Sequence, residues 1–241
     1  MGVVPHSFLQ RWARKLRVLP ANRICFGDVQ AHAKTAPYTF HRPSAALLES
    51  LEPGDLVKVW FEYEPRWWNV YSGERMWVII KARDGDGLTG ELDNIPFDAT
   101  GLKPGDKVQF RIENVLSAER QDPEGDATEP YWAFCTTSQA VLDGAPVDFL
   151  ARSEPLERQA GDKGPDSGWS ILAAGETGEQ VYEAGLARSV PLGRVLNNDD
   201  RWLHLIDEPP GQAFEWSDEA SEFVRLAPFE PGKEAEASGD D

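Results

Sequence analysis

The side chains with the greatest potential for chemistry in this sequence are its carboxylates, which number 41 in 241 residues. Asp166 and Glu176 lie on either side of one short apolar run, and Asp199 follows further along the chain. Two carboxylates that face one substrate can serve as general acid and general base. Because so many acids also form close pairs by chance, a carboxylate-dependent enzyme centred on Asp166 and Glu176 is an alternative hypothesis and not the leading one.

The histidines and cysteines show no arrangement typical of a metal centre or a nucleophile. The histidines are His6, His32, His41 and His204, and no two of them have metal-ligand spacing. Cys25 and Cys135 are too few for a disulfide framework, and Cys135 beside an aromatic residue is typical of a small core residue. The sequence also lacks the phosphate-binding loop, the dinucleotide-binding glycines and the serine-hydrolase elbow. We therefore predict no catalytic residue, no metal site and no cofactor.

The charge of the chain is strongly negative and unevenly distributed. The formal net charge is −17, which argues against nucleic acid as a direct partner because phosphate binding needs a basic patch. Residues 1–48 carry seven Lys and Arg against one acid, a net charge of +6, so the remaining residues carry −23. Within that basic segment, residues 7–18 have the apolar face of an amphipathic helix. The negative charge fits either a soluble protein that repels other copies of itself or a protein that attracts a basic partner.

The composition indicates a folded protein without a membrane span. Hydrophobic residues make up 41% of the chain and nine residues are Trp, which is too apolar for a disordered chain. No apolar run approaches the roughly 18 residues that a membrane span needs. The N-terminus lacks the uninterrupted apolar core of a signal peptide. With only two cysteines, we expect a cytoplasmic location.

The chain is predicted to form an α+β fold with two small domains built on twisted, mainly antiparallel sheets. Residues 1–48 form a basic helical segment, and residues 49–118 form a β-rich domain that is either a small twisted sheet or an open barrel. Residues 119–130 are acidic and poor in apolar side chains, which is typical of an interdomain linker. Residues 131–228 form the second domain, and residues 229–241 form a disordered acidic tail.

Local sequence patterns predict the positions of the strands. Residues 51–62 and 102–113 share a Pro-Gly-Asp turn followed by alternating apolar and polar residues, which predicts a half-buried strand in both places. Asp-Gly-Asp-Gly at 84–87 predicts a hairpin between strands over 74–83 and 88–93. The second domain is predicted to contain a short helix from Pro191 and strands at 131–136, 146–151, 169–174, 201–206 and 213–216.

One stretch of turn, strand and turn carries a family resemblance. Asp-Ser-Gly-Trp at 166–169 precedes a small apolar strand and Ala-Gly-Glu at 174–176. Together with Cys-Thr-Thr at 135–137 and Asp-Asp-Arg at 199–201, this pattern resembles a domain of immunity proteins from bacterial polymorphic toxin systems, over roughly residues 131–216. The resemblance implies a protein that binds a cognate toxin and neutralises it.

Adjacent tryptophans in the first domain are a further candidate interaction site. On an extended chain Trp67 and Trp68 point to opposite faces, so either one is exposed for a partner, or one fills the core while the other caps a barrel end. Residues 73–108 resemble a second, uncharacterised bacterial domain family, which implies a fold and little about activity. Trp169 is expected to support its loop from the core side. The predicted binding residues are Asp166, Ser167, Gly168, Trp169, Glu176, Asp199, Trp67 and Trp68.

The leading hypothesis is therefore a non-catalytic immunity protein that neutralises a cognate, basic toxin by direct binding. Two alternatives stay open, namely the carboxylate-dependent enzyme and a general scaffold for protein interactions.

Overall fold

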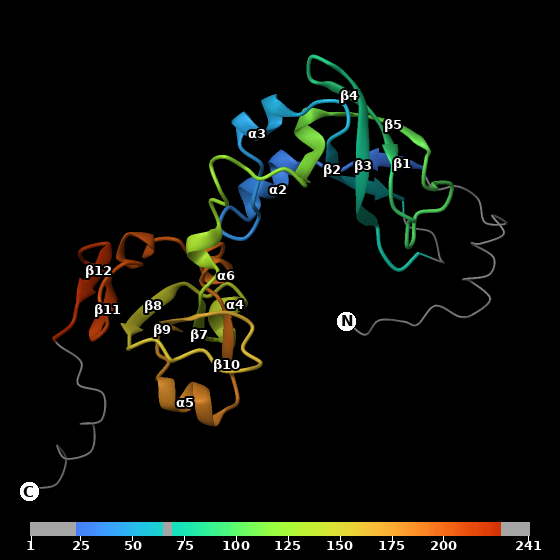
Figure 1. The fold of residues 1–241 in the computed structure, drawn as a ribbon. Helices are drawn as coiled ribbons and strands as arrows, with labels where there is room; N and C mark the ends of the chain where they lie inside the picture. Colours follow the sequence, from blue (N-terminus) through green and yellow to red (C-terminus); the bar gives the residue numbers. More distant parts are fainter. Residues whose placement is uncertain (1–22, 65–68, 228–241) are drawn as a thin grey trace, which may run out of the picture. The chain divides into compact units, whose positions relative to one another are not determined.

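The computed structural model describes residues 23–64 and 69–227, which divide into two compact units (Figure 1). The first unit comprises the described residues up to Thr35 together with Phe40–Ala127, and the second comprises Ala36–Thr39 and the residues from Thr128 onward. Each unit has its own sheet and its own hydrophobic core. The predicted α+β fold with two sheets is confirmed. The predicted N-terminal helix and acidic tail lie outside the described residues.

The sheet of the first unit closes most of the way into a barrel, which confirms the open-barrel alternative. The strands pair antiparallel in the order β1-β2-β3-β4-β5, and a 3₁₀ turn leads from β5 into β6, which returns to pair with β2. The elements are β1 Ile24–Phe26, α2 Val29–Thr35, α3 Ala45–Ser50, β2 Leu56–Tyr63, β3 Gly73–Asp84, β4 Gly87–Leu92, β5 Lys107–Arg111, the 3₁₀ turn Ile112–Asn114 and β6 Val115–Ala118.

Alternating burial along the strands fills the barrel, as the sequence predicts. Val57, Val59 and Phe61 are fully buried on β2, and the residues between them are only partly covered. The predicted hairpin is present, because Asp84 of β3 pairs with Gly87 of β4.

The two Pro-Gly-Asp turns form as predicted and use equivalent hydrogen bonds. The backbone N–H of Glu52 donates to Oδ2 of Asp55, and that of Lys103 donates to Oδ2 of Asp106, each at 2.9 Å. The aspartate side chain therefore closes the turn that feeds β2 in one case and β5 in the other.

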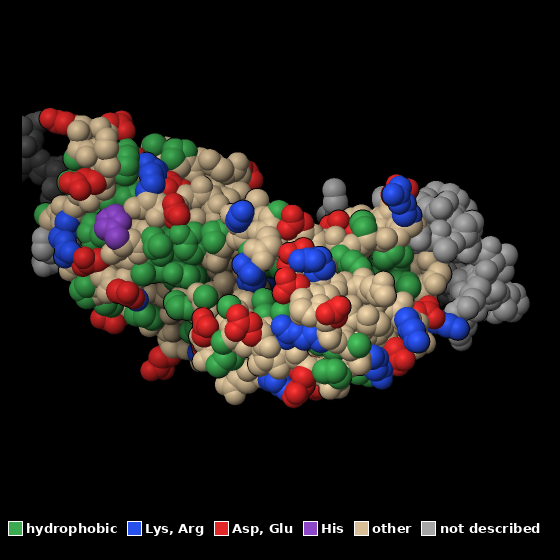
Figure 2. Space-filling model, turned by 90° about the horizontal axis from the view of Figure 1, so that it is seen from above, with side chains coloured by type: hydrophobic (Ala, Val, Ile, Leu, Met, Phe, Trp, Pro, Cys, Tyr) green, Lys and Arg blue, Asp and Glu red, His purple; other side chains and the backbone are tan. Residues whose placement is uncertain are grey.

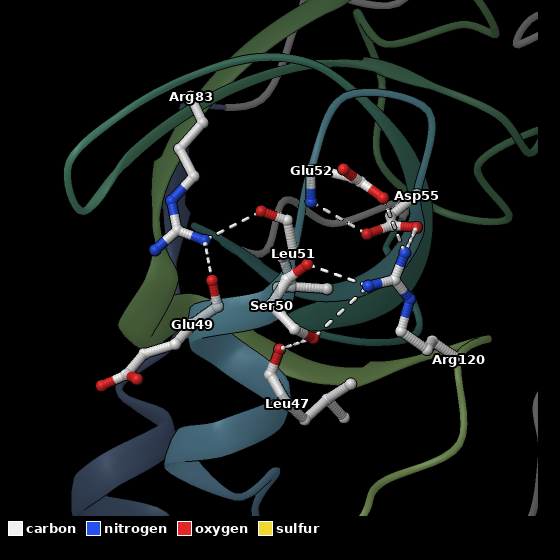
Figure 3. Close-up of polar contacts among 8 residues, drawn as sticks. All are labelled: Leu47, Glu49, Ser50, Leu51, Glu52, Asp55, Arg83 and Arg120. Carbon is white, nitrogen blue, oxygen red and sulfur yellow. Dashed lines mark hydrogen bonds and ion pairs between the residues drawn. The ribbon is translucent and has the colours of Figure 1, made fainter.

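Two arginines hold the C-terminal end of α3 (Figure 3). Nη1 of Arg83 donates to three carbonyl oxygens at this end, 2.8 to 3.1 Å away. Nη2 of Arg120 contacts the carboxylates of Glu52 and Asp55 at 3.1 and 3.0 Å. Arg120 belongs to the stretch predicted as a linker, so the first residues of that stretch are held to the first unit. The linker itself stays a prediction.

The second unit is built on a mixed sheet with the strand order β10-β7-β9-β8-β11-β12, in which β7 and β9 pair in parallel and the other pairs are antiparallel. Its strands are β7 Phe134–Ser138, β8 Val147–Arg152, β9 Asp166–Ala173, β10 Ala187–Pro191, β11 Gln212–Ser217 and β12 Glu222–Arg225. Its helices and 3₁₀ turns are Glu129–Tyr131, α4 Gln139–Leu142, α5 Gly178–Glu183, α6 Leu192–Leu196 and Leu203–Leu205.

The core of the second unit lies between the sheet and the helices α4 and α6, whose apolar residues join the same buried cluster as Trp169. The helix predicted to begin at Pro191 is confirmed, since α6 starts at the next residue. The strand predicted at 201–206 is wrong, because this stretch contains a 3₁₀ turn. Trp202 and Leu205 are both buried there, and a spacing of three suits a helical turn rather than a strand.

A short strap, Ala36–Thr39, belongs to the second unit although its neighbours in the chain belong to the first. Asn197 holds it from both sides, accepting from the N–H of Tyr38 at 3.1 Å and donating to Oγ1 of Thr39 at 2.6 Å. The Tyr38 hydroxyl donates to Asp200 at 2.7 Å. A Cβ on Gly193 of α6 would overlap the Tyr38 carbonyl oxygen, so only glycine lets the strap lie this close.

Candidate functional site

The candidate site lies where β9 begins, under a long connection from β8. Residues 153–165 carry no helix or strand, and nearly all of them are exposed. Pro155 and Pro165 bracket this loop and disfavour regular structure at both ends. Loops of this length inside a compact unit are uncommon and often carry function. We refer to residues 153–165 as the overhanging loop.

Ser167 ties β9 to its neighbour β7, and Gly168 fixes the loop to β9. The Ser167 hydroxyl is buried and donates to the carbonyl of Phe134 on β7 at 2.8 Å. Gly168 has φ +76°, and a Cβ there would overlap the carbonyl oxygen of Ser153. The N–H of Ser153 in turn donates to the Gly168 carbonyl at 2.9 Å. The sequence predicts a turn at these residues, whereas the structure includes them in β9.

Trp169 supports this end of the strand from the core, as the sequence predicts. Its side chain is 1% exposed and packs against Trp202 and Phe214, with ring centroids 5.8 and 6.4 Å away. The Arg152 guanidinium lies over the same ring at 5.5 Å. The Trp169 ring is therefore closed to solvent, and the exposed surface here is that of the loop.

Asp166 opens onto a cleft of about 410 Å³ between the overhanging loop and the sheet. Its Oδ2 accepts the N–H of Leu156 at 2.8 Å, which ties the loop to the start of β9. The sheet side of the cleft is formed by Phe134, Thr136, Asp166 and Ser189, from three neighbouring strands. The loop side is formed by residues 156–158 and 161–164.

The other two predicted carboxylates lie at the opposite end of β9. Glu176 accepts the N–H of Ala173 at 2.9 Å, and Asp199 accepts that of Val147, which pairs with Ala173. Because β9 has eight residues, about 3.3 Å apart along the strand, more than 20 Å of strand separates these groups from Asp166. Asp166 and Glu176 therefore do not face one substrate.

Asp199 is bound to Arg201, whose Nη2 lies 2.6 Å from Oδ2 of the carboxylate. Burial pushes the pKa of Asp199 upward, but hydrogen bonds from Arg201 and from the N–H of Val147 outweigh it and hold this pKa below its usual value. The Arg201 guanidinium also stacks on Trp216 at 4.0 Å. This ion pair fastens strand ends together, and both oxygens of the Asp199 carboxylate are engaged within the unit.

The tryptophans predicted as binding residues, Trp67 and Trp68, lie outside the described residues. In the same unit the structure exposes Tyr71, which follows shortly after Trp68, and further along the chain Ile95 and Phe97, with Ile95 80% exposed. These three residues were not predicted, although Ile-Pro-Phe between polar neighbours is a visible apolar signal.

Residues 128–227 have an excess of acids, 18 Asp and Glu against 7 Lys and Arg, for a net charge of −11. Five of those bases donate hydrogen bonds within the unit, namely Arg152, Arg158, Arg188, Arg201 and Arg225. On the face drawn in Figure 2, charges of both signs are interspersed with apolar side chains. The second unit as a whole therefore attracts cations, while most of its arginines bond within the unit.

Sequence reasoning identified Asp166 but missed the other walls of its cleft. Leu156, with 78% of its side chain exposed, had one signal, since it is a lone apolar residue in a polar stretch. Thr136 and Ser189 had no such signal, because they become neighbours only when β7 pairs with β10.

Within the described ranges no group of three or more His, Cys, Asp or Glu could hold a metal ion. No helix in the described part is long and apolar enough to cross a membrane.

Comparison with known proteins gives one family. Residues 135–227 match the model of the Imm33 immunity protein domain, which confirms the resemblance of the C-terminal half to an immunity domain. The match lies within the second unit and does not itself identify Asp-Ser-Gly-Trp as a signature. Neither the curated proteins nor the solved structures gave a match to the chain.

Proposed function

We propose that the protein is an immunity protein whose second unit binds a cognate toxin in the cytoplasm and neutralises it without catalysis. The observation that carries this proposal is the match of residues 135–227 to the Imm33 immunity protein domain. The net charge of −11 on residues 128–227 supports a basic partner, because complementary charge speeds encounter and suppresses wrong partners.

The overhanging loop is the part of the second unit that we expect to meet the toxin. It is exposed along most of its length, yet Asp166 and Gly168 anchor it to the sheet. A loop fixed in this way loses little conformational freedom on binding, which favours affinity. The separation of Asp166 from Glu176 removes the main support for the enzyme alternative.

The test is rescue and direct binding with the toxin candidate encoded next to this gene. We expect the full chain to restore growth of cells that express the candidate and to bind the purified candidate with an affinity that falls as salt rises. A matched control is an unrelated acidic protein of similar charge, which should neither rescue nor bind. Growth arrest unchanged by the full chain, with no binding at low salt, would refute the proposal.

A further inference from the structure

The cleft beside Asp166 has two walls of different chemistry. The sheet wall carries a single charge, that of Asp166, together with the hydroxyls of Thr136 and Ser189. These hydroxyl residues are cross-strand partners, so they present two acceptors side by side. The sheet wall is therefore anionic and rich in hydrogen-bond acceptors.

The loop wall carries charges of both signs that offset one another. Its acids, Glu157 and Asp162, are matched in number by Arg158 and Lys163. Nη2 of Arg158 lies 3.5 Å from the carbonyl oxygen of Asp162, within the same loop. Because the charges of the loop wall cancel, the negative charge of Asp166 decides which charge a group bound against the sheet wall must carry.

We propose that this cleft receives a lysine or arginine side chain of the bound toxin, with the Asp166 carboxylate as its ion-pair partner. The inference rests on the proposed function and adds the chemistry of the contact. One oxygen of Asp166 is engaged by the N–H of Leu156, and the second is available to a cation.

The size and the apolar part of the cleft suit a long basic side chain. A volume of about 410 Å³ holds the side chain together with part of the backbone that carries it. Leu156 is largely exposed on the loop wall and Phe134 lies on the sheet wall. Lysine and arginine bury their aliphatic stems against such groups while their charged ends reach polar partners.

The first test compares two substitutions that remove the same charge. Asp166→Asn keeps an oxygen that can accept the Leu156 N–H, so the loop stays tied, but removes the ion pair. Glu157→Gln removes one charge from the loop wall of the same cleft. We expect toxin affinity to fall about tenfold or more for Asp166→Asn and less than about threefold for Glu157→Gln, as for a specific against a peripheral charge. Equal losses would overturn the inference.

The second test uses a small probe and needs no toxin. N-acetyl-arginine methylamide at millimolar concentration should shift the backbone amide resonances of Leu156 and Ser189 in the full chain. The neutral analogue N-acetyl-citrulline methylamide should not, and Asp166→Asn should abolish the shifts. Similar shifts with both probes, or none with either, would count against the cleft.

The two tests separate the inference from the proposed function. If the toxin binds but Asp166→Asn binds it as well as Glu157→Gln does, the cleft inference fails and the function stands. If the arginine probe binds at Asp166 but the toxin does not bind the chain, the function fails and the cation site stands.

Discussion

Gly168 and Gly175 offer a matched pair for testing how the candidate site is built. They stand near opposite ends of β9 and have almost the same backbone angle, φ +76° and +75°. A Cβ on Gly175 would meet nothing within 4 Å, whereas one on Gly168 would overlap the carbonyl oxygen of Ser153. Both substitutions, Gly175→Ala and Gly168→Ala, therefore carry the cost of the left-handed conformation. Only Gly168→Ala also brings a Cβ against the Ser153 carbonyl oxygen.

The expected losses follow from these contacts. The left-handed conformation costs alanine about 1–2 kcal/mol, and a less flexible unfolded chain returns about 0.4–1 kcal/mol. Gly175→Ala should therefore lower the free energy of unfolding by about 1 kcal/mol. Gly168→Ala adds about 1–3 kcal/mol of overpacking and strains the Ser153 hydrogen bond, worth about 1 kcal/mol. Its total loss should be about 3–5 kcal/mol.

The assay is calorimetry of the full chain, in which the transition of the second unit should move and that of the first should not. For a unit of about 100 residues, 1 kcal/mol shifts the melting temperature by roughly 4–8 °C. Gly168→Ala should then melt at least roughly 8 °C below Gly175→Ala. Equal shifts for the two variants would show that the close approach to Ser153 contributes nothing, and the account of the loop anchor would be wrong.

Three further predictions concern other parts of the second unit and the cysteines. Gly193→Ala should displace the strap and lower the free energy of unfolding by about 3 kcal/mol, for three hydrogen bonds of about 1 kcal/mol each. The control Gly178→Ala has open space around the new Cβ and should not lower it, as measured by urea unfolding. At pH 8 a thiol reagent should label exposed Cys25 quickly and Cys135 only after unfolding, because burial raises the pKa of Cys135 to about 12; rapid labelling of both would contradict the described core. Burial and the hydrogen bond to Asp200 raise the pKa of Tyr38 to about 12. Stability from the neutral phenol is thus present below about pH 10 and lost toward pH 12, and Tyr38→Phe should remove this loss from a pH series of unfolding curves.

The fold was predictable where the pattern was local. Alternation identified β2, Asp-Gly pairs identified the hairpin between β3 and β4, and Pro191 marked the start of α6. The stretch at 201–206 misled because Leu203 and Leu205 alternate with polar or aromatic residues, as in a strand. In the structure, burial follows a spacing of three, which only the surrounding core decides.

The candidate site was predictable only in part, for a related reason. Asp166 and Trp169 could be identified because their motif is continuous in sequence. The cleft depends on the order β10-β7-β9, which places Ser189 and Thr136 near Asp166 from strands far apart in the chain. No local pattern reports that order, and β10 itself, short and at the sheet edge, was not predicted.

The strap and the residues that hold it are synthesised at different times. Tyr38 and Asp200, which share a hydrogen bond, are 162 residues apart. At about 5–20 residues per second, the strap is synthesised roughly 8–30 s before Asp200. All the residues of the first unit are made by Ala127, while Tyr38 still lacks its partners on the second. The second unit is therefore completed last, by closing on one of the earliest described parts of the chain.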